Sequence, residues 1–173
     1  MLEIGMICAE AGEKIARVSA NMAMAADMEV RASSTATTGA YSSACQRGLP
    51  AILMERGGGG RFTDSEVQAY KQDVKNIMIR MGLLSGEEVH TVQQKNVTRA
   101  EYLEAETDGL WYPVFSAGDT FAGGAVLGTV RDIWGNLLRE YRADYPGIIL
   151  YQTVGLGVKA GDPLIAYGEY VDR

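Results

Sequence analysis

Glu55 stands at a position where a carboxylate could act as a general base. It follows the apolar run Ala51-Ile52-Leu53-Met54, which predicts a strand buried on both faces. Directly after Arg56 come four glycines, residues 57–60, which allow a backbone or a substrate to approach closely. In open α/β sheets, ligands bind at the carboxyl ends of the strands. The alternative is that Glu55 merely ends the strand and pairs at the surface with Arg56 or Arg61.

The residues around this strand predict an α/β unit. Apolar residues at intervals of three and four predict an amphipathic helix over 4–25, followed by a short strand over 29–32 and a short helix over 37–47. Thr63 and Glu66 match a capping box, which predicts the start of a further helix. The apolar face of the first helix would be Ile4, Cys8, Ala11, Ile15, Val18, Met22 and Ala25, and that of the last helix Val67, Tyr70, Val74, Ile77 and Met81.

From Val97 onward, short apolar runs separated by turns predict an all-β region. The sequence Ala-Gly-Asp occurs at 117–119 and again at 160–162, each time before a β-run, which indicates two similar halves. This region resembles the barrel sandwich of biotinyl and lipoyl domains. A covalent carrier role is disfavoured, because no lysine lies between Lys95 and Lys159. The strand candidates are residues 100–107, 109–114, 126–130, 137–142, 148–152 and 164–167.

The predicted fold class is therefore α/β, with a partial α/β domain over 1–96 and a small barrel-sandwich-like β-domain over 97–173. The strand before Glu55 needs neighbours on both edges, and the first region offers at most one other convincing strand. An unpaired strand edge favours association. We therefore expect a homo-oligomer that forms through the first region, while the second region folds independently.

Several short motifs follow one another from about Ala32 onward, beginning with Gly48-Leu49-Pro50-Ala51-Ile52 and Glu55 with its glycines. Together they resemble the succinylglutamate desuccinylase/aspartoacylase family of zinc-dependent N-acyl amino acid deacylases, which have a zinc-carboxypeptidase-like fold. The later motifs are Tyr112-Pro113-Val114, Ala117-Gly118-Asp119, Val126-Leu127-Gly128, Asp132-Ile133-Trp134-Gly135, Pro146-Gly147-Ile148-Ile149-Leu150 and Ala160-Gly161-Asp162-Pro163-Leu164.

The resemblance implies roles for individual residues. Glu55 would be the catalytic base of a linear amide hydrolysis, and Arg56 or Arg61 would bind a substrate carboxylate, although both could equally form structural ion pairs. Tyr41, 14 residues before Glu55, would contact the substrate, or it is a half-buried packing residue. The substrate would be a small N-acyl amino acid.

The zinc ligands of the family are missing from the expected place. The family binds zinc through an H-x-x-E pair and a second histidine, all upstream of the glutamate, whereas this chain has one histidine, His90, downstream. A catalytic zinc needs about three protein ligands and an open position for water. The chain thus resembles the carboxyl-terminal part of such an enzyme. We expect no tightly bound zinc and little activity from the chain alone, with His90 as a surface residue.

Composition restricts the partners. A net charge of −6 with scattered basic residues argues against nucleic acid, and no apolar stretch is long enough to span a membrane. No signal peptide is visible, so the expected location is the cytoplasm. The function predicted is a zinc-dependent deacylase present as a fragment without its zinc ligands. The alternative is a non-catalytic remnant or assembly module built on the β-domain.

Overall fold

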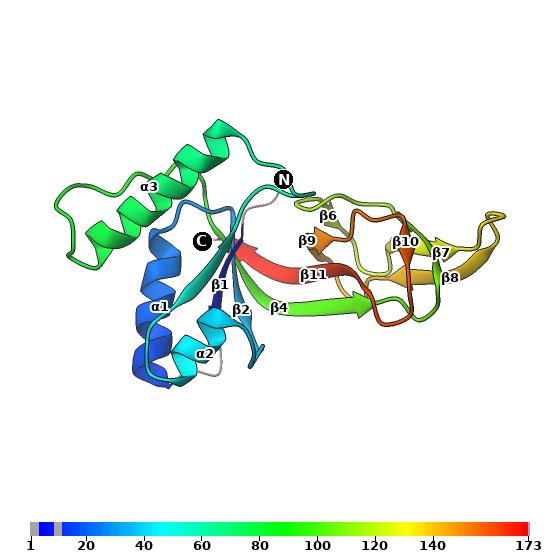
Figure 1. The fold of residues 1–173 in the computed structure, drawn as a ribbon, viewed down its shortest axis with the longest axis horizontal. Helices are drawn as coiled ribbons and strands as arrows, with labels where there is room; N and C mark the ends of the chain where they lie inside the picture. The colour runs from blue at the N-terminus through cyan, green and yellow to red at the C-terminus, as the bar shows by residue number, and fades with distance from the viewer. Residues whose placement is uncertain (1–3, 9–11, 173) are drawn as a thin grey trace. The chain divides into compact units, whose positions relative to one another are not determined.

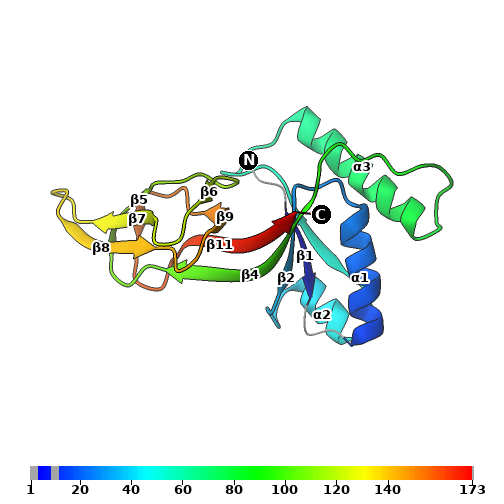
Figure 2. The same cartoon turned by 180° about the vertical axis from the view of Figure 1, so that it is seen from behind.

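The computed structural model describes residues 4–8 and 12–172 (Figures 1 and 2). The chain divides into two compact units, an α/β unit that extends to Val97 and a β unit over Thr98–Tyr170. No helix in the described part of the chain is long and apolar enough to cross a membrane. The elements of the α/β unit are β1 (Ile4–Cys8), α1 (Glu13–Ala25), β2 (Val30–Ser34), α2 (Ala40–Gln46), β3 (Ile52–Glu55), α3 (Asp64–Arg80) and the beginning of β4 (Lys95–Glu104).

The strand β1 corrects the predicted helix over 4–25, because only its second part is helical. Ile4 pairs with Val30 of β2 in parallel and with Glu55 of β3 in antiparallel. Hydrogen-bonded neighbours on both edges outweigh the helical spacing of these apolar residues, since the run is also compatible with a strand. Ala11, a member of the predicted helix face, lies outside the described residues.

The strand β3 forms where the sequence predicted it, but its place in the sheet differs. Within the α/β unit the strand order is β3-β1-β2-β4, so β3 lies at an edge, whereas β1 has a paired strand on each side. Ile52, Leu53 and Met54 are half-buried rather than enclosed on both faces. The helix α1 contacts α3 as well as β1 and β3, while α2 contacts β1 and β3. The apolar run before Glu55 is therefore covered by helices but is not at the middle of the sheet.

The helix α3 begins with the predicted capping box. Thr63 Oγ1 accepts a hydrogen bond from Glu66 N at 3.2 Å, and Thr63 N donates one to the Glu66 carboxylate at 2.6 Å. Its buried face agrees only in part with the predicted one. Val67, Tyr70 and Ile77 are half-buried, whereas Val74 and Met81 are 47% and 40% exposed. The fully buried side chains of α3 are those of Asp73 and Asn76, which find polar partners from elsewhere in the chain.

The strands of the β unit lie in two sheets, and its described residues form no closed barrel. The six strand candidates of this region are confirmed, and the barrel-sandwich arrangement is not. In one sheet the order is β10-β5-β7-β8, and in the other β4, β11, β9 and β6 follow one another. The strands after β4 are β5 (Gly109–Pro113), β6 (Thr120–Phe121), β7 (Val126–Arg131), β8 (Leu137–Arg142), β9 (Gly147–Gln152), β10 (Gly157–Val158) and β11 (Pro163–Asp172).

Both Ala-Gly-Asp motifs form the same turn. Ser116 N donates a hydrogen bond to the Asp119 carboxylate, and Lys159 N donates one to that of Asp162, each at 2.8 Å. In each turn the aspartate N–H also donates back to the carbonyl three residues earlier. Each glycine, with φ of 94° or 88°, has the left-handed conformation that favours glycine. The repeat seen in the sequence is thus a repeated turn.

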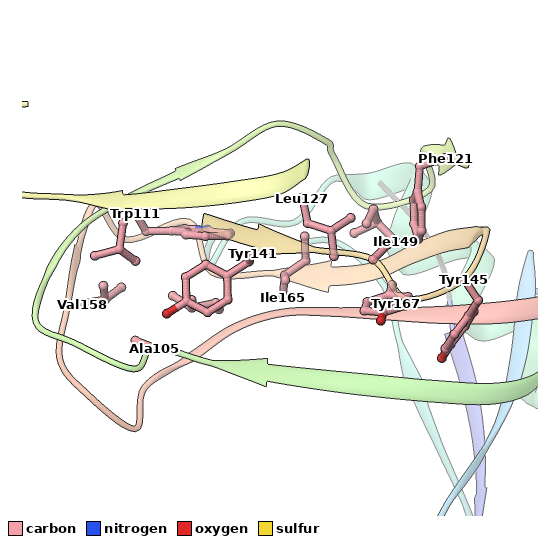
Figure 3. Packing of buried hydrophobic residues seen from close by; sticks show 13 residues of the cluster. Ala105, Trp111, Phe121, Leu127, Tyr141, Tyr145, Ile149, Val158, Ile165 and Tyr167 are labelled. Atoms are coloured by element: carbon pink, nitrogen blue, oxygen red, sulfur yellow. The ribbon is translucent and has the colours of Figure 1, made fainter. Parts of the chain in front are cut away.

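A cluster of buried aromatic and aliphatic side chains forms the core of the β unit (Figure 3). Trp111 is only 2% exposed and contacts the ring of Tyr141 edge to face, with the ring centroids 5.7 Å apart. The indole lies against the backbone of Gly128, so closely that a Cβ atom there would be 2.2 Å from the nearest ring carbon. Gly128 is therefore required by packing rather than by its dihedral angles.

Gly128→Ala is expected to lower the free energy of unfolding by about 1–3 kcal/mol, because the added methyl group would displace a buried indole. Gly157→Ala is the matched control, since a Cβ atom at Gly157 would meet nothing within 4 Å. Urea denaturation of both variants measures the difference. Equal stabilities would show that the Trp111 contact does not constrain this position.

Candidate functional site

Glu55 is the last residue of β3, as predicted, and its side chain is exposed. Among the described residues, its carboxylate forms no hydrogen bond or ion pair. The surface pairing with Arg56 or Arg61, left open by the sequence, is not formed by these residues. Glu55 therefore presents a carboxylate that is free to accept a proton or to contact a ligand.

The glycines after Arg56 form a tight turn. Gly57, Gly59 and Gly60 have φ angles of 73°, 59° and 70°, which side-chain-bearing residues rarely adopt. Arg61 N donates a hydrogen bond to Gly58 O at 3.1 Å, which closes the turn. A Cβ atom at Gly57 would lie 3.0 Å from Arg61 O. The glycines thus allow the chain to reverse beside Glu55 without covering it with side chains.

Arg56 is held inside the α/β unit, with a side chain that is 3% exposed. Its Nε and Nη2 atoms donate to Asp73 Oδ2 at 2.9 and 2.7 Å, and Nη2 also donates to Asp27 O at 2.9 Å. Asp73 is fully buried, and its Oδ1 accepts a hydrogen bond from Asp27 N at 2.8 Å. These contacts favour the structural ion pair that the sequence left open for Arg56.

Arg61 and Tyr41, the other two residues predicted to contact the substrate, differ from each other in exposure. Arg61 is exposed at the end of the glycine turn, whereas Tyr41 is half-buried on α2. Within the described part of the chain, no hydrogen bond or ion pair joins either of them to Glu55. Arg61 remains accessible to an anionic group, and Tyr41 combines a packing position with partial exposure.

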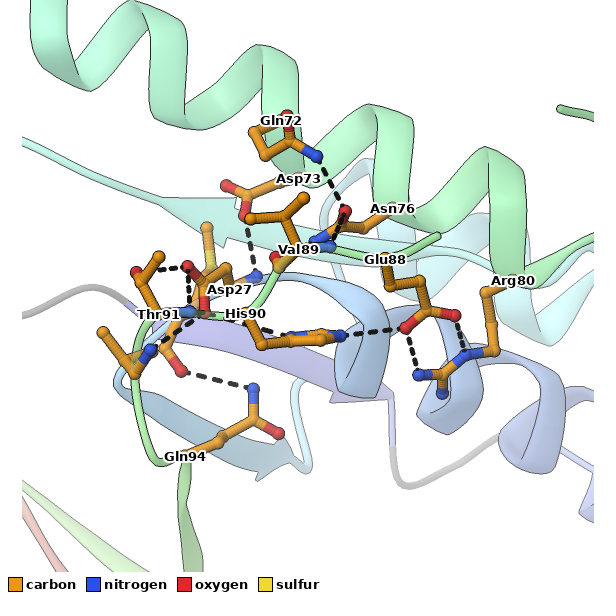
Figure 4. A network of polar contacts seen from close by, with 12 residues as sticks. Asp27, Gln72, Asp73, Asn76, Arg80, Glu88, Val89, His90, Thr91 and Gln94 are labelled. Atoms are coloured by element: carbon orange, nitrogen blue, oxygen red, sulfur yellow. Dashed lines mark hydrogen bonds and ion pairs between the residues drawn. The ribbon is translucent and has the colours of Figure 1, made fainter. Parts of the chain in front are cut away.

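His90 belongs to a polar network that fastens the segment between α3 and β4 (Figure 4). Its Nε2 atom lies 2.9 Å from the Glu88 carboxylate, which is also paired with Arg80, and its Nδ1 atom lies 3.9 Å from Asp27 Oδ1. One turn before Arg80 on α3, the Asn76 side chain donates to Val89 O and accepts from Val89 N. The imidazole is thus placed between two carboxylates within a structural network.

Asp27 anchors this network to the end of α1. Burial by itself would raise the pKa of Asp27, but hydrogen bonds from the Thr91 hydroxyl, Thr91 N and Val92 N outweigh it and lower the pKa below its usual 3.8. For Glu88, the hydrogen bond from Arg80 is the main reason that its pKa falls below 4.5. Both carboxylates are therefore more strongly stabilised as anions in the folded protein than in the unfolded chain.

A lowered folded-state pKa contributes stability that is fully present above the unfolded value and is lost as the pH falls through the folded value. We expect Asp27→Asn to unfold at a lower temperature than the parent protein at about pH 7. The difference should shrink once the pH falls below the usual Asp27 pKa of 3.8. Thermal melts across this range measure it. A difference that is independent of pH would contradict the role given to the Asp27 carboxylate.

The described residues do not fit a catalytic zinc site. They contain no group of three His, Cys, Asp or Glu side chains that could hold a metal ion. His90 already contacts Glu88, and the guanidinium of Arg80 on the same carboxylate would repel a cation. A catalytic zinc requires about three such ligands.

Sequence reasoning missed the buried polar residues of α3. Asp73 and Asn76 are polar, and their spacing of three residues gives no sign in the sequence that they are fully buried. Asp73 binds Asp27 and Arg56, and Asn76 binds Val89. Only the folded structure brings these positions together.

Comparison with solved structures identifies the class of fold, although no protein-family profile and no curated protein matches the sequence. The chain superposes on the product-bound ectoine utilization protein EutE (DoeB) from Ruegeria pomeroyi with a TM-score of 0.84 and 20% identity, over 97% of this chain and 53% of that one. A succinylglutamate desuccinylase/aspartoacylase from Rhodobacter sphaeroides gives 0.80 and 20%, over 99% and 54%. An aspartoacylase family protein from Mesorhizobium loti gives 0.77 and 19%, over 99% and 53%.

These matches confirm the resemblance seen in the sequence at the level of the fold. The chain has the fold of the carboxyl-terminal part of succinylglutamate desuccinylase/aspartoacylase structures. It spans about half the length of these proteins.

Proposed function

We propose that this chain contributes the general base, Glu55, to a hydrolase of the N-acyl amino acid deacylase type. The observation that carries the proposal is the position of Glu55, an exposed carboxylate at the end of β3 and before a glycine turn, in a chain with this fold. A general base requires a carboxylate that can reach the proton it removes. Glu55 meets this requirement because its carboxylate forms no ion pair with the described residues.

In the proposed reaction, Glu55 accepts a proton from the water that attacks the acyl carbonyl carbon. The C–N bond then breaks, and the same proton passes to the departing amine. The products are a carboxylate and a free amino acid. Arg61 is the better candidate of the two arginines for the substrate carboxylate, because the Arg56 guanidinium is bound to Asp73. Tyr41 would contribute a hydroxyl contact.

Zinc dependence is part of the proposal only through the resemblance to the family. The described residues do not supply a set of metal ligands, so those ligands would have to come from other residues or another polypeptide. For this reason the chain alone is expected to turn over little or no substrate.

The experiment is a test of amide hydrolysis by complementation. The chain is expressed alone and together with the half of Ruegeria pomeroyi EutE that it does not match, and free amino acid is measured after incubation with a panel of N-acyl amino acids, with and without added zinc. We expect amino acid release only from the combination. Release by the EutE half alone, or by no combination, would count against a catalytic contribution from this chain.

A non-catalytic assembly module is the second candidate function. It is favoured by exposed apolar side chains in the turn between β7 and β8, where Ile133 and Trp134 are 77% and 82% exposed. The homo-oligomer expected from the sequence, and the resemblance of the β region to barrel-sandwich domains, are part of this second proposal. Sedimentation equilibrium of the chain tests it, and a monomer at all concentrations would count against self-assembly.

A further inference from the structure

The hydroxyl group of Tyr70, on α3, contacts the backbone on both sides of Glu55. It donates a hydrogen bond to the carbonyl of Met54 at 3.0 Å and accepts one from the N–H of Arg56 at 2.9 Å. Along a strand, the backbone groups of residues two apart point to the same edge. The Tyr70 hydroxyl therefore takes the place that a neighbouring strand would have at this end of β3.

A second anchor lies one turn further along the same helix face. Asp73, three residues after Tyr70, binds the guanidinium of Arg56 through two donors. The guanidinium carbon also lies 5.7 Å from the centre of the Tyr70 ring. Because Arg56 directly follows Glu55, its buried side chain fixes the direction in which the chain leaves the strand.

We infer that Tyr70 and the Arg56–Asp73 pair are positioning residues for Glu55. The inference rests on the proposed function, in which Glu55 is the base. Its carboxylate has no partner among the described residues, so its location depends on the backbone that carries it. Catalytic groups act efficiently when that support is rigid, and small misplacements are costly. Helix α3 would then hold the base without touching the substrate.

The test is the variant Tyr70→Phe, which removes only the hydroxyl, with Tyr112→Phe on the exposed surface of the β unit as the matched control. Amide hydrogen exchange on the full chain reports directly how well each backbone N–H group is protected from solvent. We expect the Arg56 amide to exchange about tenfold faster or more in Tyr70→Phe, with unchanged exchange in the middle of α3. In the complementation assay, kcat should fall by about tenfold or more while KM stays constant.

The possible outcomes separate this inference from the proposed function. Unchanged exchange at Arg56 in Tyr70→Phe would overturn the positioning role. An unchanged kcat in Tyr70→Phe would do the same if Glu55→Gln lowers kcat. If Glu55→Gln leaves turnover unchanged, the proposed function is lost. The exchange result would then still decide whether Tyr70 holds this segment. Faster exchange together with a lower kcat, and neither change in Tyr112→Phe, supports the inference.

Discussion

Asp73→Ala is expected to lower the free energy of unfolding by about 3–5 kcal/mol, because it removes one charge of a buried ion pair and leaves the other in place. The Arg56 side chain is 3% exposed and that of Asp73 is fully buried, so water cannot replace the lost carboxylate. The substitution also removes the acceptor for Asp27 N, at the corner between α1 and β2. Urea denaturation followed by circular dichroism measures the loss.

Two further variants show whether the charge pair is responsible. Asp64→Ala, in the exposed first turn of the same helix, should cost less than about 1 kcal/mol. The double variant Arg56→Met with Asp73→Leu should recover much of the stability, because apolar residues often replace a buried ion pair without loss. If Asp73→Ala were as stable as Asp64→Ala, the ion pair would not contribute to folding.

The elements with strong local signals could be predicted from the sequence. The capping box at Thr63 marked the start of α3, and the apolar run before Glu55 marked β3. The two Gly-Asp turns and the β-runs of the second region were also readable. Each of these depends on residues within a few positions of one another, so no knowledge of the fold is needed.

The position of each strand in the sheet could not be predicted. The apolar spacing of the β1 residues predicts a continuation of the helix that follows them. The same spacing also suits a strand, and only the pairing with β2 and β3 decides between the two. The apolar run of β3 predicts a central strand, although covering helices bury an edge strand as well. Both errors arise because strand pairing is a long-range property.

The candidate site divides in the same way. Glu55 at the end of its strand followed from local sequence. The role of Arg56 did not, because its partner Asp73 lies 17 residues away. The helical spacing predicts only that Tyr70 lies on the apolar face of its helix. It does not predict that the Tyr70 hydroxyl binds the backbone beside Glu55. Polar contacts between distant segments leave no periodic pattern in the sequence.

Glu55→Gln is expected to have the largest effect on activity. Glutamine keeps the size of the side chain but cannot accept the proton from the attacking water. A positioned general base contributes roughly 10²- to 10⁴-fold to a rate, so kcat of the complemented enzyme should fall by about that factor. Stability should change little, because the carboxylate is exposed and forms no hydrogen bond or ion pair with the described residues.

The most direct measurement is kcat for the complemented enzyme with Glu55 and with Glu55→Gln. Glu101→Gln serves as a control in the β unit. The account predicts a fall of about 10²-fold or more for Glu55→Gln and an unchanged kcat for Glu101→Gln. Equal turnover by the parent and Glu55→Gln, with both proteins folded, would contradict the assignment of Glu55 as the base.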